Sequence, residues 1–369
     1  MQKIGISIYA DYYSLDECKK KIDRAKELGF TEVFTSLNFS EYGFPNAEED
    51  IYEKQTAVLE YAKKQAMRVH ADITKNLILR LGGNIDDLSC FVNMSLPIIR
   101  LDSGFNDDEV VKMTRNPYGI KIEENMSNYA TAENRVLAVA ADGNLDNLCG
   151  FHNFYPRVDT GIRLQEALQK AKFYHHYGVE TGIFIGSLYS DADMNDKGSS
   201  VMTLEDHRYR PSDVQTSELL AYKEFDNIVF GDTNPRDDEL LSVSKVFKLW
   251  DQGCGYIQLP CYLDSVDDEL RRKLLSTTFT SRVDIPEKVI RACEIRGTVK
   301  PEIQNPIFRN KGCITIDNRL SNQYCGELEI PLEDMNPMKN INVIGQVKPY
   351  AFNLLKTIHE DLTPFRLSE

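Results

Sequence analysis

The sequence predicts a (β/α)8 TIM barrel followed by a small β-rich domain. Eight short apolar stretches typical of strands alternate with eight helical patterns over roughly the first 250 residues, as in such a barrel. Beyond Gly255, short strand-like runs are separated by proline and glycine, which is typical of a small β barrel or sandwich. Because 369 residues exceed what one core usually supports, we expect a barrel domain over 1–250 and a β domain over 251–369.

The barrel elements follow from hydrophobic periodicity and from residues that start and stop helices. A first strand over 3–10 leads to a helix that Ser14 caps and Gly29 ends. Further strands are expected at 31–37, 68–73, 97–102, 119–124, 148–154, 179–186 and 227–232. Helices are expected at 46–66, up to 81, and at 107–114, 131–140, 164–177, 212–224 and 237–250. In the second domain the expected strands are 256–263, 298–304, 313–317, 327–330 and 342–347.

Charge and composition narrow the partners. A net charge of −14 disfavours nucleic acid and anionic membranes, although it permits a local basic pocket for one phosphate group. The first eight residues lack the basic and apolar regions of a signal peptide, and no apolar run reaches the roughly 20 residues of a membrane helix. The eight scattered cysteines contain no Cys-x-x-Cys pair. We therefore expect a cytoplasmic protein with reduced thiols.

Residues 148–156, Leu-Cys-Gly-Phe-His-Asn-Phe-Tyr-Pro, form the most informative stretch. An apolar strand ends there in His152, Asn153 and Tyr155, and Pro156 prevents the strand from continuing as a ladder member. An active-site wall and a hydrogen-bonded strand end with a satisfied histidine explain this stretch equally well.

Every other predicted strand except the seventh also ends in polar side chains, where a barrel carries its active site. These ends are Tyr9 to Asp11, Ser36 to Asn38, His70 to Asp72, Arg100 to Asp102, Glu123 to Asn125, and Asp232. The loop after the seventh strand adds Glu205, Asp206, His207 and Arg208. A terminal Asp or Asn commonly only caps the next helix, but seven polar ends on one rim favour a site. We rank Asp102 above Asp72, because Arg100 two residues earlier shares its face.

Carboxylates with amides and imidazole suit sugar chemistry or metal-assisted chemistry. The chain has neither His-x-His nor His-Glu-x-x-His spacing, so we expect no metal and no cofactor. In glycoside hydrolysis one carboxyl group protonates the leaving oxygen, and another acts as nucleophile or base.

Several motifs resemble one family of proteins. In the first domain they are 5–9 (Gly-Ile-Ser-Ile-Tyr), 34–37, 100–105 (Arg-Leu-Asp-Ser-Gly-Phe), 121–123, 152–157 with Thr160-Gly161, and 203–208 (Thr-Leu-Glu-Asp-His-Arg). In the second they are 282–284, 289–296, 314–318, 324–327 and 342–345. The sequence resembles the "outer surface protein" family that includes the 6-phospho-N-acetylmuramidases, glycoside hydrolase family 170.

The resemblance implies a TIM barrel, a cyclophilin-like β domain, and cytoplasmic cleavage of N-acetylmuramic acid 6-phosphate from N-acetylglucosamine in cell-wall recycling. The "outer surface" name conflicts with the expected absence of a signal peptide. Three departures from the family pattern are Lys197 to Met202 before the Thr-Leu-Glu motif, Glu124 in place of Leu, and Ala10 in place of Pro.

Within this resemblance we assign Asp102 and Glu205 as the acid/base and nucleophile-or-base pair, with Asp232 as the substitute for either. From spacing alone, a solvated surface charge explains Glu205 equally well. Substrate binding is assigned to a polar wall: Tyr9, Asp72, Arg100, Glu123, Asn125, His152, Asn153, Tyr155 and His207. Strand-end caps are the alternative for Glu123 and Asn125. His207 would tune the acid, with a helix-cap or loop role as an equal alternative.

The 6-phosphate needs an arginine or lysine fork or a helix N-terminus. The candidates are Arg208, Arg309 and Arg319, with Arg291 and Arg296 behind them, and surface salt bridges are the alternative. Asp317, Tyr324 and Glu327 either contact the substrate or only pack their own sheet.

The partner implied is a small phosphorylated disaccharide, and the chain is compatible with a monomer or a homo-oligomer. Three other interpretations stay open. The first is a sugar-phosphate-binding or regulatory protein without activity, and the second is a glycosidase for another 6-phospho-sugar. The third is a metal-dependent isomerase or epimerase, which chelator sensitivity would support.

Overall fold

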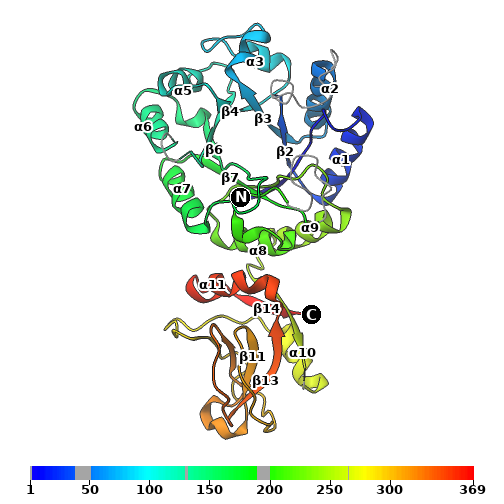
Figure 1. Ribbon diagram of the computed structural model, residues 1–369, viewed down its shortest axis with the longest axis vertical. Coiled ribbons are helices and arrows are strands. Elements are labelled where there is room, and N and C mark those ends of the chain that lie inside the picture. Colours follow the sequence, from blue (N-terminus) through cyan, green and yellow to red (C-terminus); the bar gives the residue numbers. More distant parts are fainter. Residues whose placement is uncertain (1, 38–50, 129–131, 189–199, 265) are drawn as a thin grey trace. The chain divides into compact units, whose positions relative to one another are not determined.

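Eight parallel strands form a closed barrel in the order in which they occur along the chain (Figure 1). They are β1 (Lys3–Ser7), β2 (Glu32–Ser36), β3 (Arg68–Thr74), β4 (Ile98–Ser103), β5 (Lys121–Asn125), β6 (Leu148–Phe151), β7 (Glu180–Ile185) and β8 (Asn227–Phe230). Pairing of β1 with β8, Lys3 opposite Asn227, closes the ring. The predicted TIM-like barrel is confirmed.

Helices alternate with the strands. They are α1 (Leu15–Leu28), α2 (Ile51–Lys64), α3 (Lys75–Arg80), α4 (Ser89–Asn93), α5 (Asp107–Thr114), α6 (Ala132–Asp142), α7 (Leu164–His176), α8 (Ser212–Tyr222) and α9 (Asp237–Asp251). In Figure 1, α1, α2, α5, α6 and α7 lie outside the ring of strands. A parallel barrel requires such a layer, because it buries the outer faces of the strands.

The computed structural model describes residues 2–37, 51–128, 132–188, 200–264 and 266–369. Predicted features that lie outside these ranges include Asn38 and the start of the helix expected from residue 46. The chain divides into a first unit, Met1–Ser212 with Lys223–Lys245, and a second unit, Asp213–Tyr222 with Val246–Glu369. The second unit therefore takes in α8 and the last turns of α9 as well as the β-rich part.

Helix α1 shows how local sequence sets these elements. Ser14 and Glu17 form a capping box, in which each side chain accepts a hydrogen bond from the other residue's backbone N–H. Its buried face places Cys18, Ile22 and other small or aliphatic residues at spacings of three and four. Gly29 ends the helix at a φ of 94°, which a residue with a side chain rarely adopts.

The barrel interior is filled by an aromatic layer. Tyr9, Phe34, Phe151 and Phe184 are fully buried there with Val229. The ring centroids of Phe151 and Phe184 are 4.6 Å apart, and those of Phe34 and Phe184 are 4.9 Å apart. Polar side chains on the same strands must therefore lie above or below this layer.

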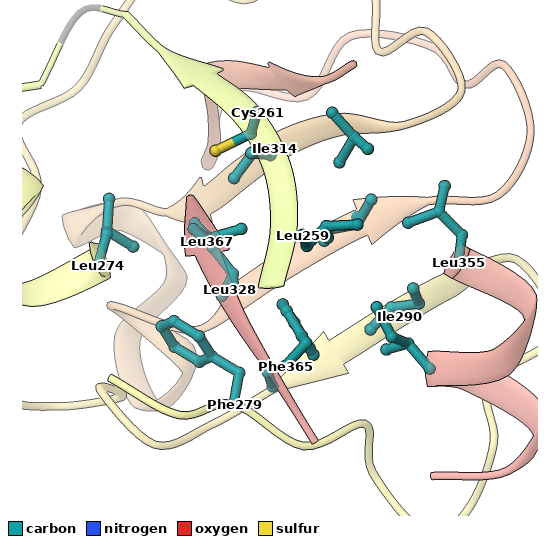
Figure 2. Packing of buried hydrophobic residues seen from close by; sticks show 14 of the residues in the cluster. Leu259, Cys261, Leu274, Phe279, Ile290, Ile314, Leu328, Leu355, Phe365 and Leu367 are labelled. Atoms are coloured by element: carbon teal, nitrogen blue, oxygen red, sulfur yellow. The ribbon is translucent and has the colours of Figure 1, made fainter. Parts of the chain in front are cut away.

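The second unit contains a curled six-stranded sheet in the order β10-β12-β11-β13-β9-β14. The elements are β9 (Ile257–Leu263), α10 (Asp268–Ser276), β10 (Val289–Ala292), β11 (Cys313–Asp317), β12 (Leu328–Pro331), β13 (Ile341–Val347), α11 (Phe352–Glu360) and β14 (Phe365–Ser368). Only β14 with β9 is a parallel pair, so the sheet is mixed. Figure 2 shows its core, where Leu259, Ile314 and Phe365 meet from different strands.

The sequence predictions for this unit were partly wrong. Strands were correctly expected at β9, β11, β12 and β13, but residues 298–304 form no strand. Pro301 lies in that segment and has no N–H to donate to a ladder. The short edge strands β10 and β14 and the helices α10 and α11 were not predicted.

In the part of the chain that the structure describes, no helix is long and apolar enough to span a membrane. All eight cysteines are free thiols.

Candidate active site

Three polar residues are hydrogen-bonded to one another at the carboxyl-terminal ends of the barrel strands. We call this end of the barrel the rim. Arg100 of β4 donates from Nη1 to Asp72 Oδ1 of β3 at 2.6 Å. It also donates from Nη2 to Asn153 Oδ1, just beyond β6, at 3.1 Å. The Arg100 side chain is 1 % exposed, whereas that of Asp72 is 12 % exposed. The arginine therefore holds from beneath an acid that reaches the surface.

A β-bulge directs the second acid of the rim. Ile73 pairs with Leu101 but Thr74 pairs with Ser103, so the register shifts and Asp102 is the extra residue of a bulge in β4. Such bulges interrupt the alternation of side chains and re-aim the residue involved. Asp102 is exposed. Arg100 was expected to orient this residue. The arginine donates to Asp72 and Asn153, and Asp102 acts on Asp72 and Arg100 through its charge.

The pKa of Asp72 suits an acid catalyst. Burial raises it, and the negative charges of Asp102 and Glu123 add to the rise. Arg100 opposes this effect through its charge and its hydrogen bond, and the pKa of Asp72 is about 6. A carboxyl group with a pKa near neutrality can hold a proton and deliver it under physiological conditions.

A chain of alternating charges continues from Arg100 into the barrel. Arg100 Nε lies 3.9 Å from Glu123 Oε1. Glu123 Oε2 lies 2.5 Å from His70 Nδ1, and His70 Nε2 lies 2.9 Å from Glu32 Oε2. Burial alone would lower the pKa of His70, but the two glutamates raise it to about 9, so both ring nitrogens donate.

The same chain reaches the opposite end of the barrel. Glu32 accepts from Arg68 at 2.7 Å, and Arg68 is paired with Glu180 at 2.5 Å. Glu180 also accepts from Lys3 at 2.9 Å. The rim arginine is thus the last cation of a network that spans the whole barrel.

Asn153 is held in place by residues on the outer side of the barrel. Its backbone N–H donates to Ser127 Oγ at 2.9 Å, and Ser127 lies 3.1 Å from His152 Nδ1. His152 Nε2 donates to the carbonyl of Ala167 at 3.2 Å. Burial lowers the pKa of His152 to about 4, so the ring is neutral.

His152 was expected to contact the substrate, and this expectation is corrected. The side chain is fully buried with both nitrogens engaged, because alternation along β6 turns it toward the helices. Of the two alternatives for this stretch, the hydrogen-bonded strand end therefore describes His152 better than the active-site wall does. Asn153, one position later, faces the rim.

Glu205 is the centre of a clamp between two loops. Its carboxylate accepts from the backbone N–H groups of Asp159 and Gly161 at 3.0 and 2.7 Å. Arg208 donates to both of its oxygens at 2.6 and 2.7 Å. A Cβ at Gly161 would lie 2.6 Å from the Glu205 backbone nitrogen, so only glycine permits this approach.

This geometry disfavours Glu205 as the acid and Arg208 as the phosphate-binding residue. Hydrogen bonds from Arg208 hold the pKa of Glu205 at about 2, which leaves no proton to donate at neutral pH. Arg208 also donates to the carbonyls of Ser200, Tyr155 and Arg157, which leaves no fork for a phosphate group. Both residues join the loops after β6 and β7.

Asp232 follows β8 and is fully buried. It accepts from the backbone N–H of Ser187 at 2.7 Å and from that of Val201 at 3.1 Å. Burial raises its pKa to about 7, despite these hydrogen bonds. The carboxyl group therefore ties Ser187 and Val201, which follow β7, to the end of β8.

Other predicted rim residues are buried or are engaged in contacts within the barrel. Tyr9 belongs to the buried aromatic layer, and burial raises the pKa of its hydroxyl well above the usual value. Asn125 accepts from the N–H of Ser127 at 3.0 Å, which is the strand-end cap that was the alternative for it. His207 is buried, and Glu123 lies beneath Arg100. Tyr155 is partly exposed, and its backbone pairs with Met202.

Three candidates of the second unit surround one pocket: Arg309, Asp317 and Tyr324. Glu327 lies fully buried beside it and pairs with Arg291 at 2.6 Å and with Arg296 at 3.4 Å. Arg319 is an exposed partner of Glu302 at 2.9 Å, which is the surface salt bridge that was its alternative.

The inner charged chain was not recognised from the sequence. Its signal is the alternation of polar residues in β3, where Arg68, His70 and Asp72 share the inward face. Pairing these with Glu32 and Glu123 requires knowing the register between strands, which a single sequence does not provide. Among the described residues, no group of three or more His, Cys, Asp or Glu side chains is placed to hold a metal ion.

A closed barrel whose rim carries carboxyl groups of raised pKa is suited to acid/base catalysis at that rim. Models of the N-terminal and C-terminal parts of 6-phospho-N-acetylmuramidase match residues 4–245 and 257–368. The chain belongs to the 6-phospho-N-acetylmuramidase family and is a glycosidase.

Two solved structures share the fold over the whole chain. An uncharacterized B. cereus protein is 26% identical with a TM-score of 0.84, and all of both chains is covered. A conserved protein of unknown function from Enterococcus faecalis is 22% identical with a TM-score of 0.73, over 99% of this chain and 96% of that one. No curated protein matches the sequence.

Proposed function

We propose that the protein hydrolyses the bond between N-acetylmuramic acid 6-phosphate and N-acetylglucosamine, in the cytoplasm, during recycling of cell-wall fragments. The family, whose models match both parts of the chain, supports this assignment. We also propose that the curled sheet of the second unit is the cyclophilin-like domain that the family resemblance implies.

The observation that carries the proposal is the pair of rim carboxyl groups on neighbouring strands. Asp72 is buried enough to keep a proton near neutral pH, whereas Asp102 is exposed. We assign Asp72 as the acid that protonates the leaving oxygen and Asp102 as the nucleophile or base. This assignment replaces the earlier pair of Asp102 and Glu205.

The remaining rim residues position these two acids and the sugar. Arg100 fixes the orientation of Asp72 and shares its charge with Glu123. Asn153 holds Arg100 through its side-chain oxygen, and its amide N–H groups are suited to the oxygens of a sugar. Glu205 and Asp232 stabilise the loops around the site.

Hydrolysis of the 6-phosphorylated disaccharide by the purified protein tests the proposal. We expect release of N-acetylglucosamine from this substrate and none from the same disaccharide without phosphate. NMR of the first anomer formed distinguishes retention from inversion. Equal cleavage of both substrates would point to another specificity, and no cleavage of either at high enzyme concentration would refute the function.

A further inference from the structure

The second unit contains a pocket of about 320 Å³ that the catalytic assignment does not use. This volume is at the lower end of small-ligand sites and suits a single sugar ring. Its charged and polar lining residues are Arg291, Arg309, Asp317, Glu329 and Asn340, and its apolar ones include Tyr324, Met335, Met338 and Ile341.

Glu329 forms no close ion pair with the two arginines that line this pocket. Glu329 lies 3.8 Å from Arg291 Nε and 3.9 Å from Arg309 Nη1, both beyond hydrogen-bond length. By contrast, Arg291 donates to Glu327 Oε1 at 2.7 Å in the same sheet. The Arg309 side chain is only 5 % exposed, and its Nε donates to the carbonyl of Asn336. Buried charges that serve stability alone normally pair closely.

This arrangement leaves Arg309 able to bind an anion. Burial raises the pKa of Glu329 to about 7, and the charge of Asp317 adds to the rise, so Glu329 only partly neutralises the arginine. Arg291 is already neutralised by Glu327, which is buried behind it. An oxyanion that enters between Arg309 and Glu329 would gain charge-assisted hydrogen bonds that the empty pocket lacks.

The rest of the lining suits a sugar ring. Tyr324 is 40 % exposed and carries the guanidinium of Arg296 at 4.6 Å from its ring centroid, which fixes the ring. Aromatic and methionine side chains bury the apolar face of a ring, while Asn340 and Asp317 offer partners for hydroxyl groups. Two arginines on the wall make a divalent cation an unsuitable ligand.

We propose that this pocket is a second ligand site, which binds an acidic sugar through Arg309, with its carboxylate or phosphate group between Arg309 and Glu329. Only the choice of an acidic sugar as ligand rests on the proposed function, since acidic sugars are the substrates proposed for the barrel. The pocket and the rim share no residues.

Methionine methyl NMR provides a local test in the full-length chain. Met335 and Met338 line the pocket, and Met→Leu variants assign their signals. The probes are glucuronate for the carboxylate, glucose 6-phosphate for the phosphate, and glucose and inorganic phosphate as controls. We expect at least one acidic sugar to shift both signals at millimolar concentration, and glucose to bind much more weakly.

Variants separate a binding site from a structural cluster. Arg309→Gln is expected to weaken the acidic sugar at least about tenfold, whereas Arg319→Gln, on an exposed arginine, leaves affinity unchanged. Glu329→Gln keeps the size of the side chain and removes its charge, so at pH 8 it should tighten binding; it tests the site even if Arg309→Gln fails to fold.

Three results would overturn the inference. They are no shift with either acidic sugar, equal affinity in wild type and Arg309→Gln, or inorganic phosphate binding as well as the sugars. These probes contain no glycosidic bond, so the test is independent of hydrolysis. If the disaccharide is not hydrolysed but the acidic sugars still shift the methionine signals, the proposed function is refuted and the second ligand site stands. If the disaccharide is hydrolysed but the signals do not shift, the second ligand site is refuted and the proposed function stands.

Discussion

Replacement of Asp72 by asparagine tests the acid on which the mechanism depends. The substitution keeps a side-chain oxygen for Arg100 but removes the proton. In the protein the pKa of Asp72 is raised from 3.8 to about 6. At pH 7 about one tenth of a carboxyl group with that pKa is protonated, against roughly one in 1,600 without the shift. The raised pKa thus increases the protonated fraction of Asp72 at pH 7 roughly 150-fold.

The assay compares two substrates with leaving groups of different acidity. On the 6-phosphorylated disaccharide we expect Asp72→Asn to lower kcat/KM by about 10²- to 10⁴-fold, because the sugar leaving group needs a proton. A 4-nitrophenyl glycoside of the same phospho-sugar needs little protonation, so its hydrolysis should fall by less than about tenfold. The alkaline limb of the wild-type profile, with a midpoint near pH 6, should disappear in the variant.

Asp102→Asn is the matched control. It removes a neighbouring carboxylate that both substrates require as nucleophile or base, so both reactions should be lost. Equal loss of both substrates in Asp72→Asn, with an unchanged Tm, would refute the acid role, and so would full activity on the disaccharide.

Three further predictions concern stability, measured by urea denaturation. Glu205→Gln should lower the free energy of unfolding by about 1–2 kcal/mol at pH 7, since solvent screens this partly exposed carboxylate, and the deficit should vanish from about pH 5 to pH 2, because the low pKa of Glu205 reflects its bonds to Arg208. His70→Gln should destabilise the protein below about pH 6, with the deficit shrinking as the pH rises through 9, the raised pKa of His70. Gly182→Ala should cost about 1–3 kcal/mol, since a Cβ there would lie 2.1 Å from the ring of Phe151. A pH-independent deficit would contradict the first two, and wild-type stability the third.

The order of the strands and the polar rim could be predicted from the sequence, because periodicity and strand ends are local properties. The partner of Arg100 could not, since the bulge at Asp102 breaks the alternation that a prediction relies on. The clamp on Glu205 joins residues 44 and 46 positions apart, and loops have no periodicity to reveal such contacts. For His152 the sequence was sufficient, because the alternation of side chains along the strand already places it on the outer face of the barrel.

Burial is the main reason that Asp72 keeps a raised pKa beside an arginine, and the charged chain within the barrel adds to this effect. A lone Arg100 would favour the carboxylate strongly, but Glu123 beneath it draws on the same positive charge, and His70 holds Glu123 in place. The charge of Glu123 itself raises the pKa of Asp72. Glu123→Gln should therefore lower the pKa of Asp72 and move the alkaline limb of kcat/KM to lower pH. If stability falls while the limb stays in place, Glu123 supports only the fold and the acid is set by burial alone.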